Sequence, residues 1–205
     1  MSWEFKPMRK GILKQELILS EFQKQVLIGY LLGDGHLETW GNSKVARLKV
    51  EQSLEQREFV SWLFEVFGEF VKTPPKFKAK SIYFNSLSSK QFFIFHKMFY
   101  PNGKKVIPYD IETLLTPISL TIWFMGDGSI KSKECNGRIL NTHGFTKNEI
   151  QKVIQTLSQK FSLQASIRRQ KDGLQIYISA KSAGKLYQIL FPHLLPSFYY
   201  KLPKV

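Results

Sequence analysis

The sequence predicts an α+β fold built from two pseudo-symmetric αββαββα repeats, and three observations lead to it. An apolar run that ends in Gly-Asp-Gly occurs twice, and its aspartates, Asp34 and Asp127, are separated by a little under half of the 205-residue chain. After each copy, apolar residues first alternate with period two and then recur with helical spacing. The same order of elements follows in both halves. A repeat of this length indicates a duplicated domain and not a short-repeat solenoid.

The first repeat is expected over 21–103, after an N-terminal arm at 1–20. Ser20 can cap a motif helix over 21–33. In the second hairpin of this half, Phe77 and Ala79 are expected on the core face, because they alternate with lysines. The elements after the motif helix are a hairpin with strands at 36–40 and 45–52, a helix over about 55–70, a hairpin over about 76–87 and a helix over 89–99.

A linker at 104–115 leads to the second repeat, expected over 116–205. Its motif helix begins near Pro117, a residue favoured in the first helical turn. Thr146 and Glu149 have the spacing of a capping box. Asp172-Gly173 is a strong hairpin turn signal. The elements of this half are the motif helix over about 117–126, strands near 129–133 and 138–143, a helix to about 161, a hairpin over 164–179 and a helix over about 182–191.

The composition indicates a folded chain with a polyanionic partner. The net charge is +14 and 43% of the residues are hydrophobic. The basic residues are spread among apolar ones, which favours nucleic acid over an anionic membrane surface. The apolar runs are too short to span a bilayer. Cys135 is the only cysteine, so a disulfide within the chain is excluded and a reducing compartment is expected. With no signal peptide expected, we place the protein inside the cell, in an organellar matrix or a bacterial or archaeal cytoplasm.

The two aspartates are the best candidates for a metal site. If the motif helices pack side by side and roughly parallel, Asp34 and Asp127 meet at their C-terminal ends, where the helix dipole disfavours a carboxylate. Two adjacent carboxylates repel each other unless a cation lies between them. Hard divalent ions, above all Mg²⁺, suit such oxygen ligands. An Asp-Gly pair can also simply end a helix and start a turn, but two copies in matching context favour the metal site.

Four further polar residues form two pairs, and each pair has one member in each half of the chain. Lys105 and Lys201 each stand shortly before a proline, at similar distances after the aspartate of their half. A lysine near a scissile phosphate can stabilise developing charge or help to activate water. Gln52 and His143 stand at the ends of matching strands and could position water. Any of these side chains alone could be an ordinary surface group.

The hairpins are expected to present a cationic, hydrogen-bonding face. The major groove of DNA admits two-stranded ribbons, and Arg, Lys, Asn and Gln read base edges there. Such faces can also be ordinary solvated sheet surfaces, although a row of like-charged lysines weakens that interpretation. The candidate DNA-binding residues are Arg47, Lys49, Lys76, Lys78, Lys80, Tyr83, Asn85, Lys131, Lys133, Arg138, Arg168, Gln170, Gln175 and Tyr177.

The doubled motif and the αββαββα repeats resemble the LAGLIDADG homing endonucleases of the single-chain, two-repeat type, over about 20–203. The stretches 115–120 and 200–203 are similar to those of one member of that family. The resemblance implies that the motif helices pack together, that each repeat has a curved antiparallel sheet, and that the two sheets form a saddle on the DNA major groove. It also implies a monomeric, site-specific enzyme that cuts both strands and leaves 3′ overhangs.

The resemblance further implies a set of site residues. Asp34 and Asp127 would bind Mg²⁺, with help from the backbone carbonyls of Gly33 and Gly126. Mn²⁺ would substitute for Mg²⁺, and Ca²⁺ would support binding without cutting. Lys105 and Lys201 match the active-site lysines of the family, and Gln52 and His143 match its polar pocket residues. His143 stands where glutamine is common, and Ile122 stands where the first copy has Gly29.

Other functions remain open at this point. An RNA-splicing maturase would bind structured intron RNA and would need neither aspartate. A DNA-binding regulator on the same fold would also dispense with them, as would a protein that coats chromosomes without sequence preference. The presence of both aspartates favours the nuclease.

Overall fold

The structure, a computed structural model, describes residues 17–132 and 134–204 and divides into two compact units. The first unit holds the described residues up to Gln23 together with His36–His96. The second holds Lys24–Gly35 and the chain from Lys97 onward. Most of the first motif helix therefore groups with the second half of the chain. Most of the expected N-terminal arm lies outside the described residues.

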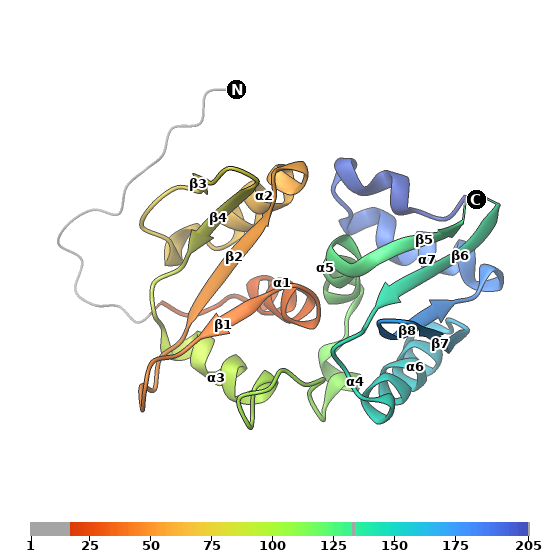
Figure 1. Cartoon of the computed structure of the whole chain (residues 1–205), viewed down its shortest axis with the longest axis horizontal. Helices are drawn as coiled ribbons and strands as arrows, with labels where there is room; N and C mark the ends of the chain where they lie inside the picture. Colours follow the sequence, from red (N-terminus) through yellow and green to blue (C-terminus); the bar gives the residue numbers. More distant parts are fainter. Residues whose placement is uncertain (1–16, 133, 205) are drawn as a thin grey trace. The chain divides into compact units, whose positions relative to one another are not determined.

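The first unit is built on a four-stranded antiparallel sheet (Figure 1). Along the second strand Leu48 and Val50 are buried, while Lys49 between them is half-exposed. Glu51 of the same strand lies opposite Tyr83. This alternation confirms the period-two pattern and gives the sheet one core face and one polar face. In spatial order the strands are β1 (His36–Glu38), β2 (Arg47–Ser53), β4 (Ser81–Asn85) and β3 (Lys76–Phe77).

Helices cover the core face of this sheet. The helix expected over 55–70 is divided into η1 (Leu54–Gln56), α2 (Arg57–Val66) and η2 (Gly68–Phe70). Phe64 of α2 makes an edge contact with Phe84 of β4, with the ring centroids 5.8 Å apart. α3 (Lys90–Phe99) follows and lies partly in this unit.

The expected core position of Phe77 is wrong. Strand β3 has only two residues at the sheet edge, and Phe77 is 70% exposed. Ala79 is also exposed, in the loop between β3 and β4. The alternation of lysines with apolar residues here reflects a protruding loop and not a strand with a buried face.

The second unit repeats the antiparallel sheet in the order β5 (Gly128–Ser132), β6 (Cys135–Asn141), β8 (Gly173–Ile178) and β7 (Ala165–Gln170). The turn between β7 and β8 consists of Lys171 and Asp172, one residue before the predicted Asp172-Gly173 pair, and Gly173 begins β8 with a φ of +139° that favours glycine. Figure 1 shows α6 (Lys147–Phe161) running along the β7–β8 side of the sheet, in agreement with its contacts to both strands.

Three of the described helices begin at residues whose side chains cap the first turn. α1 (Glu21–Leu32) starts after Ser20, whose Oγ accepts from the Gln23 backbone N–H. α5 (Pro117–Asp127) starts after Thr116, and α6 starts after Thr146, which forms the predicted capping box. Each cap satisfies backbone donors that the first helical turn leaves without a partner.

The linker and the C-terminal region contain short helices that the sequence pattern did not predict. α4 (Ile111–Leu114) lies in the linker. The helix predicted over about 182–191 is confirmed as α7 (Ala183–Leu190), which is flanked by the short η3 (Ala180–Ser182) and η4 (Phe191–His193), and η5 (Pro196–Lys201) follows. Among the described residues, none of these helices has the length and apolarity needed to cross a bilayer.

Candidate active site

The two motif helices α1 and α5 pack against each other in the second unit, and Gly29 makes their contact possible. A Cβ atom placed on Gly29 would lie 2.3 Å from the Ser119 carbonyl oxygen and 2.7 Å from Ile122 Cβ. Real Cβ atoms do not approach so closely, so the backbones meet here because the glycine has no side chain. Ile122 occupies the place of a second glycine and packs against the first. One glycine on one helix therefore suffices for close approach.

Each motif helix ends in a tight turn that fixes its aspartate. The Gly35 N–H donates to the Tyr30 carbonyl at 2.7 Å, and the Gly128 N–H donates to the Phe124 carbonyl. A Cβ on either glycine would lie within 2.5 Å of the carbonyl oxygen that its own N–H contacts. The second glycine of each Gly-Asp-Gly is therefore required by the turn, and the aspartate between the glycines stands at the helix end.

Asp34 and Asp127 lie at the same end of the helix pair. A Cβ on Gly33 would be 3.1 Å from Asp127 Oδ2, and a Cβ on Gly126 would be 3.8 Å from Asp34 Oδ2. Each carboxylate thus reaches toward the glycine of the opposite helix. Burial and, after it, the Asp34 charge raise the pKa of Asp127 to about 7, while the Trp123 Nε1–H, 3.3 Å from Oδ2, opposes the shift.

This pair fits a hard divalent cation. Two facing carboxylates, one with a raised pKa, are stabilised by a positive ion between them. Among the described residues no cluster of three or more His, Cys, Asp or Glu side chains could complete a protein cage. Mg²⁺ suits such an incomplete set, because it retains water ligands and takes oxygens from substrate phosphates.

Lys105 lies beside the first aspartate. Its Nζ donates to the Gly33 carbonyl at 2.5 Å and to the Gly35 carbonyl at 2.8 Å, so it contacts the backbone on both sides of Asp34. Burial lowers the pKa of Lys105 to about 8, while Asp127 and Asp34 act in the opposite direction.

Lys201 lies in the corresponding place beside the second aspartate. Its Nζ donates to the Met125 carbonyl at 2.6 Å and to the Gly126 carbonyl at 3.4 Å. The residue is only 7% exposed, and burial lowers its pKa to about 8, again against the charges of Asp127 and Asp34. The carbonyls of Gly33 and Gly126, which we expected to assist the metal, thus each accept from a lysine. A carbonyl oxygen has two lone pairs, so this contact leaves room for a second partner.

His143 lies just beyond the end of β6 and is exposed. A cavity of about 240 Å³ brings His143 together with residues of both motif copies and with Lys105. Its lining is Leu32, Gly33, Lys105, Asp127, Asn141, Thr142, His143, Gly144 and Phe145. The sequence thus predicted His143, Lys105 and Asp127 in one place, and the structure adds Asn141, whose Oδ1 accepts from Gln175 Nε2 at 2.7 Å.

Strand register gives a different counterpart for Gln52. His36 pairs with Lys49 in the first sheet, and Ser129, the corresponding residue of the second sheet, pairs with Ile139. Counting three residues onward, Gln52 corresponds to Thr142, one position before His143. Gln52 is nearly buried at the end of β2. Sequence spacing alone missed this correspondence because the two hairpins differ in length.

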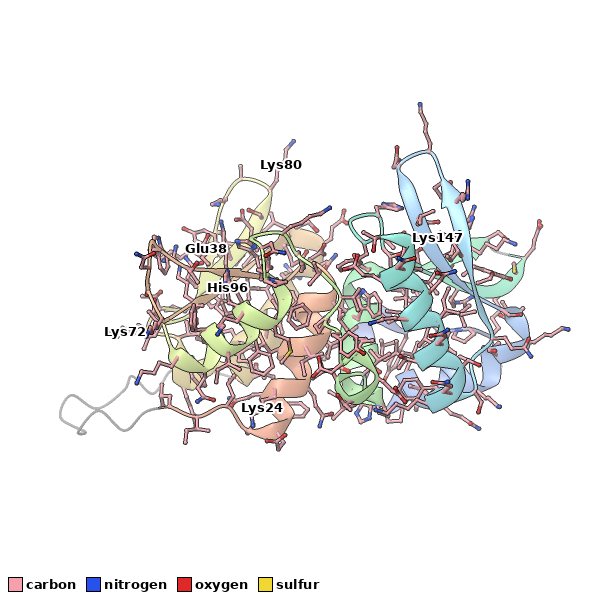
Figure 2. The ribbon with its side chains drawn as sticks, turned by 90° about the horizontal axis from the view of Figure 1, so that it is seen from below. Lys24, Glu38, Lys72, Lys80, His96 and Lys147 are labelled. Atoms are coloured by element: carbon pink, nitrogen blue, oxygen red, sulfur yellow. The ribbon has the colours of Figure 1, made fainter. Side chains whose placement is uncertain are left out.

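The polar face of the first sheet carries most of the candidate DNA-binding residues of that half. Arg47 and Lys49 of β2 flank Glu38, with nitrogen–oxygen distances of 2.7 and 3.5 Å. Lys78 donates to Glu51 at 2.9 Å and lies over the Tyr83 ring. These exposed ion pairs are weak and can exchange a carboxylate for a phosphate. Figure 2 shows Lys80 extending away from the ribbon at the loop between β3 and β4. Lys76 is also exposed, and Asn85 is half-buried in β4.

The second sheet presents a comparable face. Lys131 of β5 lies 4.9 Å from the Tyr177 ring centroid, and Gln175 contacts Asn141. Arg168 and Gln170 lie on β7, where Gln170 is exposed and Arg168 is half-buried. Lys133 lies outside the described residues.

Arg138 does not belong to this face. It is only 4% exposed, and its Nε donates to the Lys201 carbonyl at 2.7 Å. Register explains the difference: Arg138 pairs with Ile130, as Leu48 pairs with Leu37 in the first sheet, so it stands at a core position. The expectation that it faces outward is wrong, because its charge favours an exposed position whereas its parity in the strand places it on the core face.

Comparison with known proteins gives a consistent result. Residues 24–186 match the model of the LAGLIDADG DNA endonuclease family. The chain is 32% identical over 210 residues to a probable intron-encoded endonuclease of Wickerhamomyces canadensis, covering 94% of this chain and 89% of the relative. It is 29% identical over 208 residues to the cytochrome b mRNA maturase bI2 of Debaryomyces hansenii, covering 95% and 78%.

A solved structure supports the same grouping. The homing endonuclease I-WcaI bound to its DNA recognition sequence superposes with a TM-score of 0.87 and 30% identity, covering 94% of this chain and 91% of that one. Variants of the homing endonuclease I-DmoI have the same fold, with a TM-score of 0.55 and 16% identity, covering 82% and 97%.

Proposed function

Because the chain belongs to the LAGLIDADG DNA endonuclease family, we propose that it is a sequence-specific homing endonuclease that makes a double-strand break in a long DNA target and leaves 3′ overhangs. One observation carries the proposal: Asp34 and Asp127 stand at adjoining helix ends, each with a lysine beside it. A protein that only bound DNA would need neither the paired carboxylates nor the buried lysines.

Asp34 and Asp127 would hold Mg²⁺, and Mn²⁺ would substitute for it. When bound, the cation neutralises charge on the phosphate and lowers the pKa of a bound water. The carbonyls of Gly33 and Gly126, each of which accepts from a lysine, would assist the two aspartates through their remaining lone pair. One carboxylate for each motif copy gives one cleavage centre for each DNA strand.

The lysines supply positive charge where the scissile phosphates would lie. Each ammonium is held by two backbone carbonyls and is largely excluded from solvent, so its field is weakly screened. Since their pKa is about 8, part of each lysine population is neutral at slightly alkaline pH. A neutral amine can accept a proton from water, and His143 and Gln52 would orient that water.

The two sheets would supply the DNA contacts. The first sheet would contribute residues of β2, β3, β4 and their loops: Arg47, Lys49, Lys76, Lys78, Lys80, Tyr83 and Asn85. The second contributes Lys131, Arg168, Gln170, Gln175 and Tyr177, and Lys133 remains a candidate there. We assign the repeats to 21–103 and 116–205, joined by the linker 104–115, and expect a monomer inside the cell.

A cleavage selection tests the proposal. Purified protein with Mg²⁺ is mixed with a large pool of duplex DNA, and the cut ends are sequenced. We expect ends that share one long sequence and carry 3′ overhangs, and none from the Asp127→Asn variant. With Ca²⁺ in place of Mg²⁺, the same duplex should be bound and remain intact. Recovery of no shared cut site would contradict the proposal.

The similarity to a cytochrome b mRNA maturase favours RNA splicing as a second candidate function. In that case the protein would bind a structured intron RNA and promote its splicing, alone or in addition to cutting DNA. An in vitro splicing reaction separates the two activities, because the Asp34→Asn/Asp127→Asn double variant should still promote splicing. Loss of splicing in that variant would link the two activities to one site.

A further inference from the structure

A buried arginine holds the backbone that carries Lys201. Arg138 Nε donates to the Lys201 carbonyl at 2.7 Å, and its Nη2 donates to the Leu202 carbonyl. Its Nη1 contacts the carbonyls of Gly137 at 3.0 Å and Cys135 at 3.4 Å. The guanidinium therefore joins the first residues of β6 to the end of the chain.

A second side chain of β6 extends this attachment. Asn136 Nδ2 donates to the Lys204 carbonyl at 2.7 Å, and the Lys204 N–H donates to Asn136 Oδ1 at 2.9 Å. We call Asn136 and Arg138 the C-terminal clasp. The clasp fixes the backbone over 201–204, and the Lys201 side chain extends from that backbone to the end of α5.

The other motif copy lacks an equivalent arginine. The register counterpart of Arg138 is Leu48, which is fully buried and apolar. The segment after Lys105 is held differently: the Val106 N–H donates to the Phe99 carbonyl at 2.9 Å, and the Ile107 N–H donates to Glu149 Oε1 at 2.8 Å. The clasp therefore serves one lysine of the two.

The energetic cost of burying the Arg138 guanidinium also indicates that its contacts with the C-terminal segment matter. Removing a guanidinium from water is costly, and leucine avoids this cost at the same position of the first sheet. Among the described residues, the Arg138 guanidinium donates to four backbone carbonyls, and two of them belong to Lys201 and Leu202. These contacts fix the backbone from which the Lys201 side chain extends. A small displacement of a group beside a reacting phosphate can cost about 10²-fold in rate.

We propose that Arg138 is a positioning residue for Lys201, so that its loss disables one of the two cleavage centres and turns the enzyme into one that nicks a single, defined strand. The strand bias rests on the proposed endonuclease function. The effect on the accessibility of Lys201 does not depend on it.

A plasmid that carries one target site tests the strand bias. We expect Arg138→Leu, which copies Leu48, to slow linearisation about 10²-fold and to accumulate nicked circles, while the first nick keeps its rate within about threefold. The strand left intact should be the one that Lys201→Met leaves intact. Arg138→Lys keeps the charge and should recover part of the rate. The matched control, Leu48→Met, should linearise the plasmid like the wild type. Equal slowing on both strands, or sparing of the opposite strand, would overturn the proposal.

Amine labelling provides a readout that needs no cleavage. The reaction of each lysine with an acylating reagent is followed by mass spectrometry in the folded protein. Lys201 should react at least about tenfold faster in Arg138→Leu and in Asn136→Ala than in the wild type, and Lys105 should be unchanged. Asn136→Ala removes half of the clasp and serves if the leucine variant does not fold. Unchanged labelling of Lys201 in a folded clasp variant would refute the positioning role, whereas a wild type that cuts no DNA would refute only the proposed function.

Discussion

The Asp34–Lys105 half and the Asp127–Lys201 half of the candidate site contain the same kinds of group in different surroundings. Asp34 is exposed, whereas Asp127 is partly buried and accepts from the Trp123 indole. Lys105 contacts carbonyls on both sides of its aspartate, whereas Lys201 contacts the two residues before its own aspartate. The duplication thus preserved the groups and changed how each is held.

This difference shows what a duplicated site must keep. Both lysines have a pKa near 8 for the same first cause, burial, although one is half-buried and the other almost fully buried. The backbone turns at Gly35 and Gly128 are similar without being identical, because the Gly35 N–H donates five residues back to Tyr30 and the Gly128 N–H four residues back to Phe124. The supports around them differ: Trp123 stands where the first copy has Tyr30, and Arg138 stands where the first sheet has Leu48. The site therefore retains its groups and turns, while the two halves need not be equally active or equally stable.

The largest expected effect comes from removing either carboxylate. Asp34→Asn and Asp127→Asn should each lower double-strand cutting at least about 10³-fold, because each removes one of the two carboxylates that the described residues place at the site. DNA binding should largely survive, since the sheets supply it. Linearisation of a target plasmid and a mobility shift in Ca²⁺ measure the two properties. Full cutting by either variant would contradict the proposed mechanism, in which each half supplies one carboxylate to the site.

The lysines should separate the halves by strand. Lys105→Met and Lys201→Met should each slow the cutting of one strand about 10²-fold, and the strands affected should be opposite ones. A duplex with a different label on each strand, analysed on a denaturing gel, identifies the uncut strand. If both variants spared the same strand, the two lysines would serve one cleavage centre together. The assignment of one lysine to each half of the site would then be wrong.

The sequence predicted the repeated order of elements and the meeting of Asp34, Asp127, Lys105 and Lys201, because each depends on a pattern that occurs twice. A motif that ends in Gly-Asp-Gly places its aspartate at a helix end whatever the surroundings. The helix caps at Ser20 and Thr146 were also predictable, since a cap depends on local spacing.

The sequence could not predict features that depend on register or on neighbours distant in sequence. The charge of Arg138 predicts an outward position, but its parity in β6 places it in the core. Alternation predicts a buried Phe77, but β3 is too short to have a buried face. Thr142 became the counterpart of Gln52 only once the strand pairing was known. The indole of Trp123 carried no signal in the sequence that would distinguish it from another core aromatic.

The contact between the motif helices is also unequal, and Gly29 tests it. Gly29→Ala should lower the free energy of unfolding by about 1 to 3 kcal/mol, because the added methyl meets the Ser119 carbonyl at 2.3 Å. Ile122→Ala in the same chain should not restore the loss, since the backbone clash remains. Urea unfolding provides the measurement. The matched control is Gly68→Ala, where a Cβ would meet nothing within 4 Å. Rescue by Ile122→Ala would show that the side chain, and not the backbone, sets the helix spacing.

A pH-dependent effect of similar size distinguishes the two aspartates. In metal-free protein the folded pKa of Asp127 is about 7, above its model-compound value of 3.8, so the folded state binds a proton that the unfolded state has released. The stability that this proton contributes is fully present below about pH 4 and is lost as the pH rises through 7. Asp127→Asn should remove this dependence and be more stable than the wild type at pH 7.5, by on the order of 1 to 3 kcal/mol.

Urea unfolding with EDTA at several pH values between 4 and 7.5 provides the test, and it stays below the pKa of about 8 of the two lysines. Asp34→Asn should also stabilise the metal-free protein at pH 7.5, because the Asp34 charge is the second cause of the raised pKa of Asp127. Added Mg²⁺ should stabilise the wild type and narrow its gap to Asp127→Asn, since a ligand that binds only the folded state shifts unfolding by mass action. Equal pH dependence in the wild type and in Asp127→Asn would mean that folding does not raise the pKa of Asp127. The two halves would then be electrostatically alike.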